Sequence, residues 1–338
     1  MRLGGVLAGL IALFAAGCGP SGPTLVVYAS LEPELAKAMA AAFAEGHPGV
    51  SMKVIEVPHD QIIDRLSAER DAPGGALVWG VPAWLLHRAA LDGLLAPTPL
   101  SWSGSLPREA RDPQDRWVGV LVDPVVLAFH PDHVSRSRAP RDWIDLFHPR
   151  WRGEVVVVDP EISPTLTSLI GLKAVQALRA GADETVGFDW LMRLDASVDE
   201  YSTDIPWTLR RLSVGEHLFA AAPLSGVDDM PGDMGLEHRY FESGSPSLVI
   251  GAGRIVGAAS SPQAAEFLEW LGSDEAATAM AEDHHRIAAV TLWGPGVETG
   301  LLDRIDPLLA PPDTMDTHLD GWVRRWRSEV RGHGNTLY

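Results

Sequence analysis

Along the first hundred residues of the chain, apolar positions alternate between strand-like runs and helix-like spacing. Runs typical of buried strands occupy residues 24–29 (TLVVYA), 51–57 (SMKVIEV) and 76–79 (ALVW). Between them, apolar residues recur every three or four positions, as on one face of a helix, and Pro33 and Pro82 each open such a segment. This β-α-β-α-β order predicts a parallel α/β sheet.

Strand and helix patterns also alternate in the rest of the chain. Strand patterns cover residues 117–129, 154–159, 217–222 and 247–250. A helix pattern begins at Ser163-Pro164, and others cover residues 262–271, 274–283 and 315–331. The sequence therefore predicts a second α/β unit after the first.

The order of these patterns predicts how the chain divides into lobes. We expect residues 24–121, with a returning segment near 246–290, to form lobe 1, and residues 122–245 to form lobe 2. The helices of 291–338 suit either lobe. A length of 338 residues agrees with two cores rather than one.

Composition narrows the possible partners. Hydrophobic residues make up 46% of the chain and charged residues 21%, as in a globular protein, while the formal net charge is −18. Such an acidic chain, without a basic run, is not expected to bind nucleic acid or anionic lipid non-specifically.

The first 23 residues have the pattern of an export signal followed by a tether. Arg2 precedes an apolar run that is shorter than the roughly 20 residues of a membrane span. Ala15-Ala16-Gly17 leads into Cys18, the single cysteine, and this junction resembles a bacterial lipobox. We therefore expect a lipoprotein signal peptide at 1–17, lipid on Cys18, a tether over 18–23 and a membrane-anchored extracytoplasmic protein. The alternative is a plain secretory signal with an incidental cysteine.

Five blocks between residues 24 and 290 carry a resemblance to a known family. They are VYASLEPEL at 27–35, VWG at 78–80 with GLLAP at 93–97, DLFHPRWRG at 145–153 with DP at 159–160, EYST at 200–203, and SPQAAEFLEWL at 261–271. In this order the blocks resemble the extracellular solute-binding proteins of the iron(III), phosphonate, thiamine and spermidine group.

The resemblance implies a fold and a role. The fold is an α/β, two-lobed, periplasmic-binding-protein-like fold of type II, with the ligand cleft between the lobes. The role is the substrate-binding lipoprotein of an ABC importer, which closes on a small molecule and delivers it to permease and ATPase subunits on separate chains. We expect a monomer without a cofactor and without catalytic activity.

Three candidate ligand-binding residues lie in lobe 1. Ser30 follows the first strand and precedes a helix, where a hydroxyl and nearby N–H groups suit an anion, although a simple helix cap is an equal alternative. Trp79 and Gly80 end the third strand, where tryptophan offers an aromatic wall and glycine lets backbone approach a ligand. The alternative for Trp79 is a place in the core.

Two candidate residues of lobe 2 precede a helix. Ser163 and Thr165 flank Pro164 where family members often have Ser-Gly-Thr and use it for anions. Proline suits the first helical position but donates no hydrogen bond. We expect the two hydroxyls to remain available to an anion.

A second polar run in lobe 2 supplies four further candidates, Tyr201, Ser202, Thr203 and Asp204. Family members place small hydroxyl residues here, so Asp204 departs from the pattern. In the cleft, its carboxylate would favour an amine or a cation. The alternative is that Asp204 caps the helix opened by Pro206.

The ligand class follows from these residue types. Hydroxyl donors beside helix N-termini favour a phosphonate or an organic phosphate. Ferric iron is the alternative ligand. It ranks second because the family's iron-binding members use neighbouring tyrosines, whereas the tyrosines of this chain are isolated from one another: Tyr28, Tyr201, Tyr240 and Tyr338. Polyamines and thiamine stay open.

An extracytoplasmic hydrolase or metal-dependent enzyme is the alternative from another class. The sequence lacks a Gly-x-Ser-x-Gly elbow and a His-Glu-x-x-His motif. Residues 251–257 (GAGRIVG) and 283–285 (DHH) resemble enzyme motifs only in part. We therefore expect a binding protein.

Overall fold

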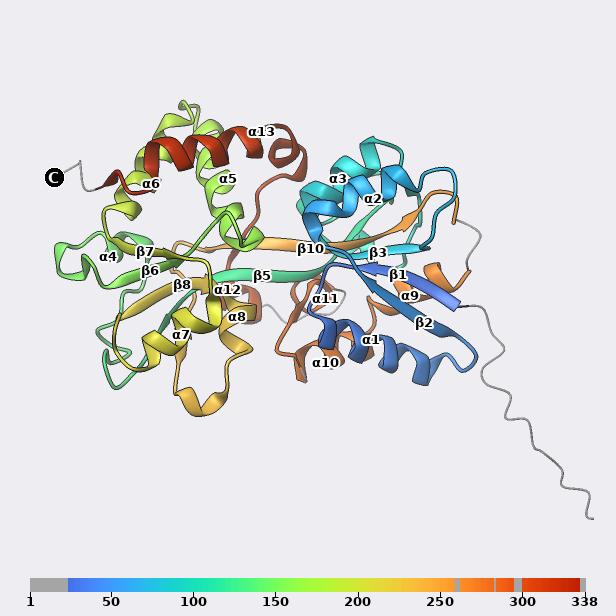
Figure 1. Cartoon of the computed structure of the whole chain (residues 1–338), viewed down its shortest axis with the longest axis horizontal. Coiled ribbons are helices and arrows are strands. Elements are labelled where there is room, and N and C mark those ends of the chain that lie inside the picture. The colour runs from blue at the N-terminus through green and yellow to red at the C-terminus, as the bar shows by residue number, and fades with distance from the viewer. Residues whose placement is uncertain (1–23, 259–261, 283, 295–299, 335–338) are drawn as a thin grey trace, which may run out of the picture.

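Two lobes of helices and strands lie side by side, joined by two long strands that run between them (Figure 1). The structure, a computed structural model, describes residues 24–258, 262–282, 284–294 and 300–334. The predicted signal peptide, the tether with Cys18, and Tyr338 lie outside these residues. Within the described ranges, no helix is both long enough and apolar enough to span a bilayer.

Lobe 1 is built around a parallel sheet in the strand order β2-β1-β3. Its first elements are β1 (Thr24–Ala29), α1 (Pro33–Gly46), β2 (Ser51–Glu56), α2 (Ile62–Ala68), β3 (Leu77–Pro82) and α3 (Ala83–Leu91). The predicted β-α-β-α-β order is therefore confirmed. Two helices from late in the chain, α9 (Pro262–Trp270) and α10 (Asp274–Glu282), add their buried side chains to the same core.

Lobe 2 repeats the parallel arrangement in the order β8-β6-β7. Its main elements are β6 (Val155–Val158), α5 (Pro164–Arg179), α6 (Thr185–Asp195), β7 (Val198–Ser202), α7 (Ile205–Ser213), β8 (Phe219–Pro223) and α8 (Leu224–Asp228). The four consecutive valines of β6 are completely buried, as a strand covered on both faces requires.

Shorter elements complete the lobes. They are β4 (Leu95–Ala96), α4 (Trp143–Leu146), β9 (Glu237–Arg239), β11 (Ile287–Ala288), α11 (Ala289–Trp293), α12 (Gly300–Ile305) and β12 (Pro307–Leu308). The predicted C-terminal helix is present as α13 (Pro312–Arg325), which continues into a π-helical turn at Trp326–Val330.

The two connecting strands are β5 (Val118–Phe129) and β10 (Ser245–Ile255), which pair antiparallel with Leu248 opposite Asp123. Beyond this crossing, β10 pairs with β3 of lobe 1, and β5 pairs with β8 of lobe 2. The ladder is therefore continuous from one lobe to the other.

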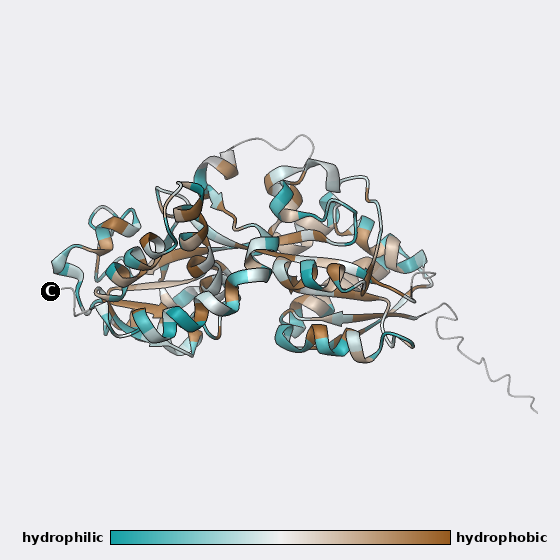
Figure 2. Ribbon diagram, turned by 90° about the horizontal axis from the view of Figure 1, so that it is seen from above, coloured by the Kyte–Doolittle hydropathy of each residue, from teal (hydrophilic) through white to brown (hydrophobic). Residues whose placement is uncertain are grey.

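Buried hydrophobic residues nevertheless form two separate cores, one on each side of the crossing. Figure 2 shows hydrophobic stretches of ribbon in both lobes. The first core draws on residues 25–122 and 249–305, and the second on residues 125–241 and 315–330. The predicted lobe boundaries stay a prediction. Because Met315, Leu319 and Trp322 pack in the second core, we propose that α13 belongs to lobe 2.

The crossing leaves no room for a side chain at Gly251. A Cβ atom there would lie 2.4 Å from the Val118 carbonyl oxygen and 2.8 Å from Leu86 Cδ1. We expect Gly251→Ala to lower the free energy of unfolding by about 1–3 kcal/mol, because overpacking forces backbone to shift. Urea denaturation measures this. Gly104→Ala, where a Cβ would meet no atom within 4 Å, is the control and should change the free energy far less.

Candidate functional site

A cleft with a volume of about 290 Å³ lies where the lobes meet. Its lining comes from strand ends and helix starts of both lobes and from the crossing strands: Ser30, Leu31, Glu32, His59, Gly80, Pro82, Leu121, Val122, Asp123, Ile162, Ser163, Pro164, Thr165, Ile205, Pro223, Ser225, Leu248, Ile250 and Arg286. This size and mixed chemistry suit a small solute with both polar and apolar parts.

Ser30 and Gly80 form part of the lobe 1 wall of the cleft, and their contact with a ligand stays a prediction. The Ser30 amide donates a hydrogen bond to the Trp79 carbonyl oxygen at 2.8 Å, which holds the two strand ends together. Gly80 has φ +82°, and a Cβ there would lie 2.3 Å from Leu31 Cγ, so only glycine permits this approach. The Ser30 hydroxyl forms no hydrogen bond with the described residues, so it is free to meet a ligand.

The start of α5 forms the facing wall in lobe 2. Ser163 caps the helix by accepting a hydrogen bond from the Leu166 amide at 3.4 Å, and Pro164 occupies the first turn. Thr165 is buried and donates its hydroxyl proton to Asp123 at 2.6 Å. Both hydroxyls lie in the cleft wall, but that of Thr165 is already engaged.

Asp123 lies at the centre of the cleft wall, and its charge is the feature that sequence reasoning missed. Its carboxylate accepts three hydrogen bonds, from the Thr165 hydroxyl at 2.6 Å, the Ser225 amide at 3.0 Å and the Ser225 hydroxyl at 3.1 Å. Burial nevertheless raises the pKa of Asp123. An aspartate followed by Pro124 inside an apolar twelve-residue strand was the signal that could have identified it.

Arg286 is the second residue that the sequence did not single out. Its guanidinium donates to both carboxylate oxygens of Asp229, at 3.0 and 2.9 Å, and lies 3.4 Å from Glu32 Oε1. Burial opposes its charge, yet the Asp229 carboxylate holds the pKa of Arg286 above its ordinary value. Since Arg286 precedes β11 of the lobe 1 core and Asp229 follows α8 of lobe 2, this ion pair connects the two lobes.

His59 adds a neutral polar group to the cleft lining. It lies in a single 3₁₀ turn at His59–Gln61, directly before α2. Burial lowers the pKa of its imidazole, so the uncharged form is favoured at neutral pH. The formal charges in the cleft lining therefore belong to Glu32, Asp123 and Arg286.

Trp79 does not form the predicted aromatic wall. Its side chain is completely buried, with its ring 5.5 Å from that of Phe267 on α9. Successive side chains of a strand point to opposite faces, and the face that Trp79 occupies is covered by this helix. The alternative of a core tryptophan is the one that the structure shows.

The run from 201 to 204 lies outside the residues that line the cleft, which corrects the prediction for all four. The Tyr201 hydroxyl donates to Asp195 at 2.8 Å and its ring packs against Trp326. Thr203 is exposed. The reason is topological, because β7 is the outermost strand and two strands separate it from β5.

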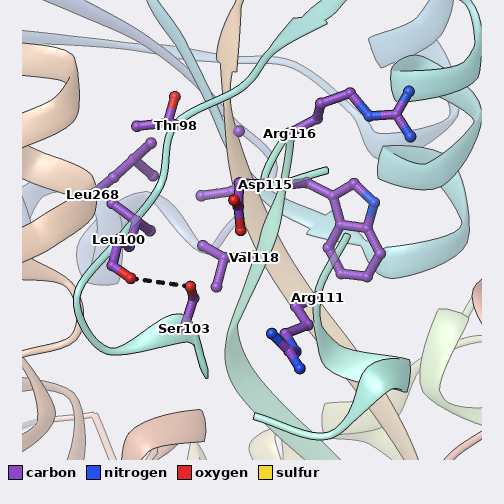
Figure 3. Close-up of a pocket in the computed structure, with 11 residues that line it drawn as sticks. Thr98, Leu100, Ser103, Arg111, Asp115, Arg116, Val118 and Leu268 are labelled. Carbon is purple, nitrogen blue, oxygen red and sulfur yellow. Dashed lines mark hydrogen bonds between the residues drawn. The ribbon is translucent and has the colours of Figure 1, made fainter. Parts of the chain in front are cut away.

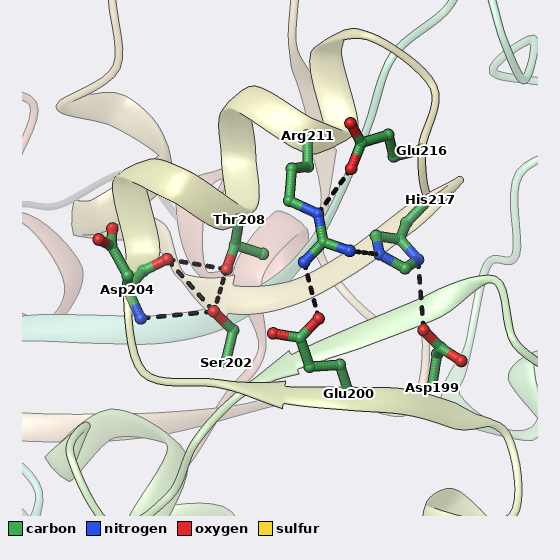
Figure 4. A network of polar contacts seen from close by, with 8 residues as sticks. All are labelled: Asp199, Glu200, Ser202, Asp204, Thr208, Arg211, Glu216 and His217. Carbon is green, nitrogen blue, oxygen red and sulfur yellow. Dashed lines mark hydrogen bonds and ion pairs between the residues drawn. The ribbon is translucent and has the colours of Figure 1, made fainter.

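Ser202 and Asp204 instead form hydrogen bonds with the first residues of α7 (Figure 4). The Asp204 carboxylate caps the helix by accepting from the Trp207 amide at 2.8 Å. The Ser202 hydroxyl accepts a hydrogen bond from the Thr208 hydroxyl. Helix capping, the alternative considered for Asp204, therefore accounts for its position, while the next residue, Ile205, reaches the cleft lining.

Two observations bear on other ligands. Among the described residues, no group of three or more histidine, cysteine, aspartate or glutamate side chains is arranged to hold a metal ion. A separate hollow in lobe 1, lined by residues that include Thr98, Ser103 and Arg116, has a volume of about 10 Å³ and fits at most a water molecule (Figure 3).

The fold is shared with solved solute-binding proteins. Iron-bound HitA from Pseudomonas aeruginosa superposes with a TM-score of 0.72 at 20% identity, over 89% of this chain and 98% of that protein. AfuA from Actinobacillus pleuropneumoniae, solved with fructose-6-phosphate, gives a TM-score of 0.70 at 19% identity, over 91% and 99%. These likenesses confirm the predicted two-lobed α/β fold of the periplasmic binding proteins.

Sequence comparisons identify the family. The chain is 25% identical over 340 residues to y4fP of Sinorhizobium fredii, named a probable ABC transporter periplasmic-binding protein, covering 98% of this chain and 93% of that protein. It is 26% identical over 322 residues to iron uptake protein A2 of Synechocystis sp., covering 85% and 81%. The family model for bacterial extracellular solute-binding proteins matches residues 83–305. The chain therefore belongs to this family of substrate-binding components of ABC transporters, which are transport proteins and not enzymes.

Proposed function

We propose that the protein captures a small organic solute bearing an anionic group, foremost a phosphonate or an organic phosphate, and delivers it to a separate permease. The observation that carries this proposal is the interlobe cleft, whose polar groups come from both lobes. A solute that contacts both walls binds more tightly when the lobes close, and therefore shifts the lobes towards the closed state.

Three groups in the cleft suit an anion. The Ser30 hydroxyl is free, the Ser163 hydroxyl lies at the N-terminus of the sixteen-residue helix α5, and Arg286 carries a positive charge. Helix N-termini and guanidinium groups both favour phosphate-like anions. Apolar lining residues such as Leu31, Ile162 and Leu248 would contact an organic body.

Two carboxylates in the same lining favour a solute that also carries an amine. Glu32 lies 3.4 Å from Arg286, and Asp123 lies in the middle of β5, opposite Leu248. An aminoalkylphosphonate presents both charges. Asp204, the carboxylate expected to select an amine, instead caps α7, and Glu32 and Asp123 are the carboxylates that line the cleft.

Ferric iron is the second candidate, favoured by the relative named iron uptake protein A2. The positions of the tyrosines argue against the tyrosine-based site of iron-binding members. Tyr28 donates its hydroxyl to Glu69 at 2.5 Å, and Tyr201 donates to Asp195. Tyr240 lines a different hollow, beside Arg239 and Arg304. Each described tyrosine therefore lies away from the cleft lining.

The predicted lipid anchor completes the proposal. With Cys18 lipidated, the protein would be held on the outer side of the cytoplasmic membrane, within reach of its permease. The free chain is proposed to act as a monomer, with the permease and ATPase as separate chains.

A thermal-shift screen tests the ligand class. We expect aminoalkylphosphonates or sugar phosphates to raise the melting temperature, because a ligand at 100 times its Kd stabilises the native state by about 2.7 kcal/mol. The panel should include polyamines, thiamine and ferric citrate. A large shift with ferric citrate alone, together with a visible absorption band, would instead establish the iron alternative.

Substitutions at the interlobe ion pair test the role of Arg286. We expect Arg286→Gln to weaken binding of the anion found in the screen at least tenfold, because it removes the charge that faces the anion. Asp229→Asn should strengthen binding, because it removes a competing carboxylate. Calorimetric titration measures both effects. Asp233→Asn, at an exposed aspartate four positions after Asp229 in the chain, is the matched control. Wild-type affinity in Arg286→Gln would exclude this role.

The anchor is tested by Cys18→Ala. We expect the variant to lose membrane association or to remain unprocessed, because the lipid has no other cysteine to attach to. Membrane fractionation and mass spectrometry measure this. An unchanged mass and membrane fraction would rule out lipidation at Cys18.

A further inference from the structure

A larger cavity lies between the lobes, apart from the cleft. Its volume is about 760 Å³, and it shares no lining residue with the cleft. Lobe 1 contributes residues from α3 and from 108–117, and lobe 2 contributes the C-terminal half of α5. The start of α13 closes it, and the lining is His87, Arg108, Glu109, Arg111, Pro113, Trp117, Val175, Leu178, Arg179, Pro311, Pro312, Asp313 and Thr314. We call this cavity the second groove.

The second groove has an excess of positive charge. Arg108 and Arg179 share one carboxylate, Glu109, at 3.1 and 3.5 Å. The half-buried Arg111 guanidinium forms no ion pair or hydrogen bond with the described residues and lies apart from Asp115 (Figure 3). Three arginines against Glu109 and Asp313 leave one net positive charge, in a chain whose total is −18. A local cation that has no partner in the described part of this acidic chain attracts an anion.

Apolar side chains line the rest of the second groove. Leu178 is 45% exposed on α5, and Val175 lies one helical turn before it. Prolines at 113, 311 and 312 supply further apolar surface. Trp117 is 3% exposed, and its indole nitrogen has no hydrogen-bond partner among the residues that the structure describes. An apolar surface beside an unpaired guanidinium complements a molecule with an apolar body and a single anionic end.

The walls of the second groove are held at their present spacing by ion pairs between the lobes. Arg88 on α3 donates to the Asp316 carboxylate on α13 at 2.5 Å and to the Asp316 carbonyl at 2.8 Å. Arg179 of α5 lies 3.5 Å from Glu109 on the lobe 1 side. A molecule bound here therefore contacts both lobes, and its occupancy depends on their separation.

We propose that the second groove is a binding site for a small amphipathic organic anion, distinct from the transported solute. The anionic group is a carboxylate, sulfonate or phosphate ester that pairs with Arg111, and an aliphatic or aromatic body lies against Leu178 and Val175. Because the site spans both lobes, its occupancy is coupled to the open–closed equilibrium, and the coupling is reciprocal.

The probe is 8-anilinonaphthalene-1-sulfonate, an aromatic sulfonate, titrated calorimetrically into the full chain. We expect one saturable site in the wild type and at least tenfold weaker binding in Arg111→Gln and in Leu178→Glu. The matched controls are Arg304→Gln, an exposed arginine of another hollow, and Val214→Glu, an apolar residue that is 67% exposed elsewhere. Both controls should bind the probe like the wild type.

Three outcomes would overturn the proposal. They are the absence of saturable binding, wild-type affinity in Arg111→Gln, and loss of binding in Arg286→Gln, which would place the probe in the cleft. Circular dichroism verifies that each variant is folded, and if Leu178→Glu is not folded, Arg111→Gln decides. Scattering tests the coupling: saturating probe should change the radius of gyration of the wild type but not of Arg111→Gln, and an unchanged wild-type radius contradicts it.

Discussion

The antiparallel pairing of β5 with β10 is the constraint on which the rest of the structure depends. Both strands begin in one lobe and end in the other, so each lobe packs its core against one half of the same pair. Hydrogen bonds between the strands resist sliding, β11 also pairs with β5 beside the crossing, and the ion pairs Arg88–Asp316 and Arg286–Asp229 join the lobes on either side of it. The crossing therefore connects two separate cores, and a change in the angle between the lobes would have to break these ion pairs.

Asp123 links this crossing to the cleft. A buried carboxylate is tolerated only when hydrogen bonds replace its lost hydration, and here Thr165 and Ser225 supply three. Both partners begin helices of lobe 2, α5 and α8, so satisfying the carboxylate also fixes where these helix starts lie. The orientation of the lobe 2 wall is thus a consequence of one desolvated charge on the hinge.

Local chemistry made much of the fold predictable, while the site depended on tertiary packing. The valine run of β6, the proline at the start of α5 and the cap at Asp204 act within a few residues, so the sequence alone indicates them. The cleft lining includes Ser30, Gly80, Ser163 and Thr165 because strand ends and helix starts of parallel sheets converge on one edge, while their contact with a ligand stays a prediction. Trp79 and the 201–204 run were misplaced because neighbouring residues in the sequence do not determine which face of a strand will be covered, or in which order the strands will pair. Arg286 gave no local signal, since its partners lie 57 and 254 positions away in the chain.

The Arg286–Asp229 pair explains how the cleft can hold a buried positive charge without losing stability. Arg286 is 9% exposed, and an unpaired guanidinium at that depth would carry a large desolvation cost. Asp229 offsets this cost in the same bidentate geometry that a phosphate or phosphonate group would offer. An entering anion must compete with Asp229 for the guanidinium, so Arg286 attracts any such anion while part of its contribution offsets the lost Asp229 pair. Selectivity must then come from groups that have no partner among the described residues before the ligand enters, namely the Ser30 hydroxyl and the apolar walls of the cleft. These groups favour an anion with an organic body over a bare inorganic ion.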